Sequence, residues 1–130
     1  MRVEAMTTAL VAMALAGCAT GGPPPGVIGA RARQCQVANI TWVLAQTVSN
    51  PVMTLSSDGW CQRSMARDQN GPLSLVAERN PLHGTLIIDG RNSTTPTYYY
   101  VPVVGYVGPD IFAMRTSTNM LVDVKVNVTP

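Results

Sequence analysis

Near its C-terminus the chain alternates strictly between valine and polar residues. Every second residue from Val122 to Val128 is valine, and Asp123, Lys125 and Asn127 lie between them. A period of two places the valines on one face of a β-strand and the polar residues on the other. A strand with one apolar face needs a second layer to cover that face, so the sequence predicts a layered β-structure.

Similar short segments recur along the rest of the chain. Valine, threonine, isoleucine and tyrosine are frequent after Cys35, and glycine or proline interrupts them at the spacing of a sandwich or barrel. We expect an all-β fold, an antiparallel β-sandwich of about seven strands. The predicted strands lie within residues 36–48, 52–55, 73–78, 86–88, 97–101, 111–115 and 122–128. Nothing resembles a βαβ unit, so a parallel sheet is not expected.

The first of these segments allows two interpretations. Within residues 34–48, Ile40 and Trp42 belong to an alternating pattern typical of a strand, whereas Val37, Leu44 and Val48 also fall near helical spacing. The β-branched and aromatic content favours a strand. Further along, Asp89-Gly90 is a pair suited to a tight turn after the strand at 86–88.

The N-terminus carries a signal of another kind. Residues 5–15 are mostly apolar, a run shorter than the about 20 residues of a membrane-spanning helix but typical of a secretory signal. The sequence Leu15-Ala16-Gly17-Cys18 that closes it resembles the lipobox of bacterial lipoproteins. The resemblance implies that residues 1–17 are a signal peptide and that Cys18 carries acyl chains such as palmitate. Because Ala19 rather than aspartate follows, it also implies the outer membrane of a bacterial envelope, facing the periplasm or the surface.

Residues 18–33 are rich in glycine and proline, which disfavour packed elements. We interpret them as a flexible tether that leads from the membrane to a single domain at residues 34–130. At about 3.1 Å per residue in its proline part, the tether could reach a few nanometres.

The chain has three cysteines, and assigning Cys18 to lipid leaves Cys35 and Cys61. A pair in an oxidising compartment predicts a disulfide, with two buried thiols as the alternative. A metal site would need more ligands than two distant cysteines and one histidine supply, so we expect no metal.

The second half of the chain resembles the bacterial immunoglobulin-like and cadherin-like repeats of surface proteins. The residues that carry the resemblance are Pro81-Leu82-His83-Gly84-Thr85-Leu86, Tyr100-Val101-Pro102 and Gly105-Tyr106-Val107-Gly108-Pro109-Asp110-Ile111-Phe112. It implies an immunoglobulin-like sandwich and a turn position for His83. Pro109 and Met114 depart from the repeat pattern. Physically, Gly105 and Gly108 permit a close corner, the Asp110 carboxylate can accept backbone hydrogen bonds, and Phe112 is a candidate core residue.

No feature of the sequence indicates an enzyme or a cofactor. None of the serines lies in a Gly-x-Ser-x-Gly context, which argues against a hydrolase. Asp89, Asp110 and Asp123 are not in the dense run that a calcium site needs. The formal net charge of +2 is carried by scattered residues, so no nucleic-acid partner is expected.

The tyrosines are the candidate binding residues. Alternation sends Tyr98 and Tyr100 to one side of a strand and Tyr99 to the other. Tyr98, Tyr99 and Tyr106 therefore form a candidate binding surface, and the alternative is that the tyrosines border the core. We expect a non-catalytic envelope lipoprotein that contacts a protein or surface glycan. An accessory lipoprotein that stabilises a larger secretion or surface assembly is the second hypothesis, and an enzyme the third.

Overall fold

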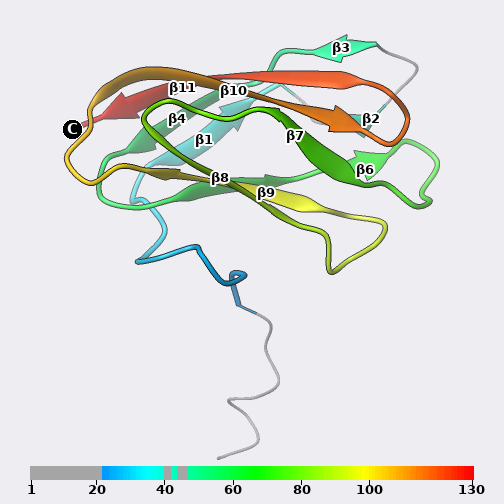
Figure 1. Cartoon of the computed structure of the whole chain (residues 1–130), viewed down its shortest axis with the longest axis horizontal. Coiled ribbons are helices and arrows are strands. Elements are labelled where there is room, and N and C mark those ends of the chain that lie inside the picture. The colour runs from blue at the N-terminus through cyan, green and yellow to red at the C-terminus, as the bar shows by residue number, and fades with distance from the viewer. Residues whose placement is uncertain (1–21, 40–41, 44–46) are drawn as a thin grey trace, which may run out of the picture.

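The computed structural model describes residues 22–39, 42–43 and 47–130, and the regular structure in these ranges is β-strand (Figure 1). The expected all-β class is therefore confirmed. The strands found there are β1 (Cys35–Ala38), β2 (Trp42–Val43), β3 (Val48–Ser49), β4 (Val52–Ser56), β5 (Cys61–Ser64), β6 (Ala66–Arg67), β7 (Leu75–Arg79), β8 (Gly84–Asp89), β9 (Thr97–Pro102), β10 (Gly108–Thr116) and β11 (Leu121–Thr129).

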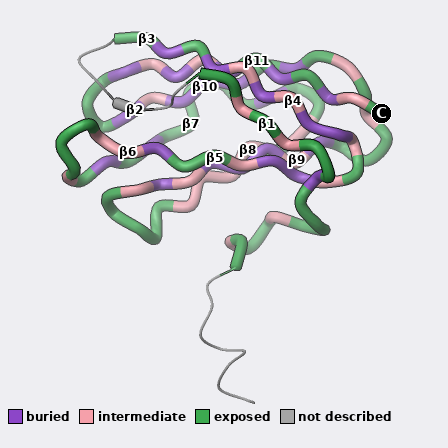
Figure 2. The backbone as a smooth tube through the Cα atoms, turned by 180° about the vertical axis from the view of Figure 1, so that it is seen from behind, coloured by how far each residue is buried: buried purple, intermediate pink, exposed green. Residues whose placement is uncertain are grey.

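The strands form two layers. The large sheet has the order β1-β4-β11-β10-β7, with β3 also paired to β11, and the small sheet has the order β5-β9-β8. A short pair, β2 with β6, stands apart from both. Figure 1 shows the small sheet beneath the large one, and Figure 2 shows buried backbone along the facing strands. The arrangement is a β-sandwich with its core between the sheets.

The core follows from the alternation seen in the sequence. Val122, Val124, Val126 and Val128 of β11 are at most 3% exposed. Phe112 of β10 is fully buried, with its ring centroid 5.9 Å from that of Tyr98 and 5.9 Å from that of Tyr100 across the sandwich. The prediction that Phe112 packs between the sheets is confirmed.

The expectation of a purely antiparallel sandwich is wrong. The β11 strand pairs parallel with β4, from Lys125 opposite Val52 to Thr129 opposite Ser56, and parallel with β3. Parallel neighbours usually need a helical crossover, and no such unit is visible in the sequence. Here the chain between β4 and β11 forms all three strands of the small sheet and also β7 and β10 of the large sheet. Most of the domain therefore forms the connection between these two parallel strands.

The segment with two interpretations contains no helix in its described part. β1 ends before Asn39, whose φ of 77° breaks the strand. β2 and β3 are two short strands further on, and residues 40–41 and 44–46 of the segment lie outside the described residues.

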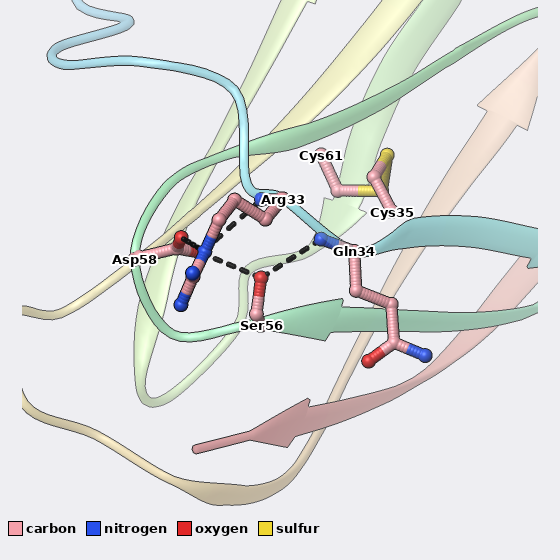
Figure 3. The surroundings of a disulfide bond; sticks show 6 residues. All are labelled: Arg33, Gln34, Cys35, Ser56, Asp58 and Cys61. Carbon is pink, nitrogen blue, oxygen red and sulfur yellow. Dashed lines mark hydrogen bonds and ion pairs between the residues drawn. A yellow bond between two sulfur atoms is a disulfide. The ribbon is translucent and has the colours of Figure 1, made fainter.

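The predicted disulfide is present. Cys35 of β1 and Cys61 of β5 are bonded, with 5.3 Å between their Cα atoms (Figure 3). The bond joins an edge strand of the large sheet to an edge strand of the small sheet. It therefore holds the two layers together at one side of the sandwich.

Residues 22–32 lie on the body of the domain, and we call them the strap. The Trp60 backbone amide donates to the Ala30 carbonyl (3.1 Å), and the Ala32 amide donates to the Trp60 carbonyl (2.8 Å). Ala32 is only 2% exposed. A side chain at Gly59 would collide with the backbone of the strap, so glycine is needed at this crossing. Packed structure thus begins before the boundary predicted between Arg33 and Gln34.

Candidate functional site

A buried carboxylate organises one end of the sandwich. Asp110, at the start of β10, is 6% exposed. Its oxygens accept hydrogen bonds from the backbone amides of Leu82 (3.0 Å) and His83 (2.9 Å) and from the Tyr100 hydroxyl (2.8 Å). The sequence predicted backbone hydrogen bonds to Asp110, and these bonds fix residues 80–83, the loop between β7 and β8.

This environment keeps Asp110 ionised. Burial opposes the charge, but the hydrogen bonds from Tyr100, His83 and Leu82 outweigh it and hold the pKa of Asp110 below its ordinary value. The pKa of Tyr100 is raised, first by burial and then by the hydrogen bond that its hydroxyl donates to Asp110. Tyr100 is therefore a fixed donor at neutral pH, which makes the pair a stable support for the loop.

A second loop, residues 103–107 between β9 and β10, is attached to the first. The Val103 amide donates to the His83 carbonyl (2.9 Å), and the Tyr106 amide donates to the Val103 carbonyl (3.0 Å). The rings of His83 and Tyr106 are stacked, with centroids 4.1 Å apart and planes within 3°. Gly105 has a φ of 88° and Gly108 one of 141°, values that favour glycine, so the predicted close corner is confirmed.

The two loops present apolar side chains to solvent. Val104 is 97% exposed and Leu82 is 85% exposed. Val103 and Val107 from the same loops are also exposed. We call Leu82, Val103, Val104 and Val107 the apolar tip. In Figure 1 the loop between β9 and β10 lies at the end of the sandwich where the C-terminus is marked.

A groove borders the apolar tip. Its volume is about 490 Å³, and it lies between the loop at Val103 and Val104 and the strap at Ile28. Ser57, Asp58 and Gly59 form part of its wall. Apolar side chains that project from hydrogen-bonded loops beside a groove form a surface suited to contact with another molecule.

Two of the three tyrosines predicted as a binding surface are buried. Tyr98 is fully buried because it points into the core, against Phe112. Tyr99 points outward from the small sheet but is only 8% exposed, and its ring packs edge-on against Trp60, 5.4 Å between centroids. The prediction is therefore wrong for Tyr98 and Tyr99. Tyr106 is half-buried and lies beside the apolar tip, stacked on His83.

The sequence analysis missed the residues of the apolar tip. The available signal was the run Pro102-Val103-Val104-Gly105, which places two valines between residues that interrupt a strand. Valines in a tight corner cannot all face the core. Their exposure could therefore have been predicted from the corner itself.

The remaining candidate residues are dispersed. His83 lies in the turn that enters β8, as the resemblance implied. Asp89 is paired with Arg91 at 2.7 Å, Asp110 supports the loops, and Asp123 lies on β11. Across residues 22–39, 42–43 and 47–130, no group of three or more histidine, cysteine or acidic side chains is placed to hold a metal ion. No helix in the same ranges is long and apolar enough to cross a membrane. Cys18 lies outside the described residues.

Comparison with known proteins leaves the family open. No family model matches the chain, and no curated protein matches it. Among solved structures, a variant of the endo-fucoidan hydrolase MfFcnA4 from glycoside hydrolase family 107 is 15% identical, with a TM-score of 0.48 over 66% of this chain and 13% of that one. The endo-fucoidan hydrolase MfFcnA9 of the same family is also 15% identical, with a TM-score of 0.39 over 66% of this chain. The chain thus spans 16% or less of the length of these enzymes. A likeness this low does not indicate a shared function.

Proposed function

We propose that the chain is a non-catalytic lipoprotein of the bacterial cell envelope that contacts a protein or surface glycan through its apolar tip. The lipobox resemblance at Leu15-Ala16-Gly17-Cys18 supports the anchor, and Ala19 supports the outer membrane. The disulfide between Cys35 and Cys61 supports an exported location, because such bonds persist in oxidising compartments.

An immunoglobulin-like fold is part of the proposal. Its support is that the residues of the resemblance act together. Tyr100 and Asp110 are hydrogen-bonded, the Asp110 carboxylate fixes the loop at Leu82 and His83, and Phe112 lies in the core beneath them. The pattern that resembles the surface-protein repeats thus corresponds to one connected structural unit.

The observation that carries the proposed contact is the exposure of Leu82 and Val104. Both side chains are more than four-fifths exposed, although the loops that hold them are fixed by Asp110 and His83. Neither side chain contributes to the core. Because they stay in water in the folded domain, removal of these apolar side chains from water, which lowers the free energy, requires contact with another molecule.

Two measurements test the proposal. The intact mass of the membrane-extracted protein should show loss of residues 1–17 and added acyl mass, and Cys18→Ser should release the protein from the membrane.

The second measurement is capture from detergent-solubilised envelopes by the wild type, by Leu82→Ser/Val104→Ser and by Val76→Ser. Val76, on β7, is the matched control because it is an exposed valine far from the tip in the fold. A partner retained by the wild type and the control but lost by the tip variant supports the proposal. Equal capture by all of them contradicts it.

A further inference from the structure

The strap crosses the outer face of the small sheet rather than hanging free. At its start, Arg91 Nη2 donates to the Gly22 carbonyl (2.6 Å). In its middle, Gly26 lies against the Ile87 side chain. At its end, Trp60 Nε1 donates to the Gly29 carbonyl (3.0 Å). Figure 1 shows this segment, in blue, beneath the layer of β8 and β9.

The docked strap leaves very little chain between it and Cys18. Gly22, the first described residue, is four residues after Cys18. Even fully extended, a stretch of this length spans at most about 14 Å. With the strap docked, the free part of the tether is a fraction of the few nanometres expected from the sequence.

We propose that the hairpin end of the small sheet, residues 90–96 with the start of the strap at Gly22, lies against the membrane and contacts anionic phospholipid headgroups. This inference rests on the proposed lipidation of Cys18, because an acylated Cys18 places the bilayer within that short span of Gly22. The hairpin residues 90–96 are the part of the domain that reaches Gly22, through Arg91.

The charge of this region suits the proposed contact. Arg31 of the strap and Thr95 of the hairpin line a groove of about 410 Å³ along the β5 edge of the small sheet, and Arg63 of β5 lines the same groove. Arg91 lies in the hairpin, and its side chain is 58% exposed even though it pairs with Asp89. Guanidinium groups form charge-assisted hydrogen bonds with phosphate oxygens, which are the acceptors that phospholipid headgroups offer.

The same orientation sets the direction of the apolar tip. β8 and β9 run from the hairpin to the tip, and each has six residues. A strand of this length covers roughly 20 Å. With the hairpin against the headgroups, the tip stands away from the bilayer and is available to a partner in the aqueous phase.

The test attaches the protein to vesicles through its own Cys18. The sample is the chain from Cys18 to Pro130, which contains every described residue. Cys18 is its one thiol, because Cys35 and Cys61 form the disulfide. The thiol is coupled to a maleimide headgroup lipid in phosphatidylglycerol/phosphatidylethanolamine nanodiscs that also contain a gadolinium-chelate lipid. Amide signals are then compared with those in nanodiscs without gadolinium.

The expected result is loss of the amide signals of Gly22 and of residues 90–95, with the signals of residues 103–107 retained. Loss centred on residues 103–107 would show the tip facing the bilayer and overturn the proposal. Equal loss over the whole domain, or loss nowhere, would show no fixed orientation and would overturn it as well. Because the lipid is attached chemically, these outcomes do not depend on whether cells acylate Cys18, which the mass measurement decides separately.

Three variants complete the test. A spacer of about ten glycine and serine residues inserted between Thr20 and Gly21 should restore the signals of residues 90–95, since it lengthens the reach. Arg91→Ala, which removes the hydrogen bond to Gly22, should restore them in part. Arg79→Ala, on the exposed face of β7, is the matched control and should leave the pattern unchanged. Signals that stay lost in the spacer variant would contradict the short tether as their cause.

Discussion

The Tyr100 hydroxyl donates a hydrogen bond of 2.8 Å to the Asp110 carboxylate inside the sandwich. Tyr100 belongs to the small sheet and Asp110 to the large sheet, so the bond ties the two layers together at the end that carries the apolar tip. A side chain at Gly84 would collide with the Tyr100 ring, which shows how closely the ring fits beneath the loop. The disulfide makes a corresponding tie between β1 and β5.

Tyr100→Phe and Tyr98→Phe should differ in their effects on stability. Tyr100→Phe removes a hydrogen bond to a charged group and should lower the free energy of unfolding by about 1.5–3 kcal/mol. Tyr98 is fully buried, and its hydroxyl has no hydrogen-bond partner among the described residues. Tyr98→Phe therefore removes an unsatisfied polar atom and should leave stability unchanged or raise it by up to about 1 kcal/mol. Urea unfolding of both variants provides the comparison, and a larger loss for Tyr98→Phe than for Tyr100→Phe would contradict this account.

The parts of the fold that the sequence predicts are those where a local pattern has one solution. The valines from Val122 to Val128 alternate with polar residues, and β11 buries all four of them. Cys35 and Cys61 were the remaining pair once Cys18 was assigned to lipid, and they are bonded. In each case the residues themselves limit the alternatives.

The parts that sequence reasoning missed depend on distant segments. β5 is a strand of polar residues, Gln62, Arg63 and Ser64 after Cys61, because it is an edge strand with a solvated face. Asp89-Gly90 does not form a tight turn, since Asp89 pairs with Arg91 and a longer loop leads to β9. Docking of the strap depends on Trp60 and Gly59, which lie far from it in the sequence and contain no signal of what they contact.

The disulfide should contribute a large share of the stability of the domain. Cys35 and Cys61 are separated by 26 residues in the sequence. Closing a loop of this length stabilises the folded state by about 3–4 kcal/mol in the chain-entropy model. Urea unfolding with and without a reductant, and of Cys35→Ala/Cys61→Ala, should show a loss of this size. The identical unfolding of reduced and oxidised protein would contradict the expectation.

Phe112→Ala and His83→Ala separate the core from the loops. Phe112 is fully buried between Tyr98 and Tyr100, so Phe112→Ala should cost about 3–5 kcal/mol or prevent folding. His83 is exposed and stacks on Tyr106, so His83→Ala should lower stability only modestly. Thermal unfolding followed by circular dichroism measures both effects. If a fully folded His83→Ala protein lost an envelope phenotype, the structural role assigned to His83 would be wrong.

Asp58 should make the stability of the domain depend on acid pH. The hydrogen bond from Ser56 Oγ (2.5 Å), followed by the bond from Arg33 Nε (2.7 Å), lowers the pKa of Asp58 from 3.8 to about 2 (Figure 3). The folded pKa lies below the unfolded one, so the stabilisation is present above pH 3.8 and is lost as the pH falls toward 2. Urea midpoints measured across this range should fall more steeply for the wild type than for Asp58→Asn. Asp68→Asn, an exposed aspartate in another loop, is the matched control and should follow the wild type. Parallel curves for the wild type and Asp58→Asn would show that these hydrogen bonds are not maintained in solution.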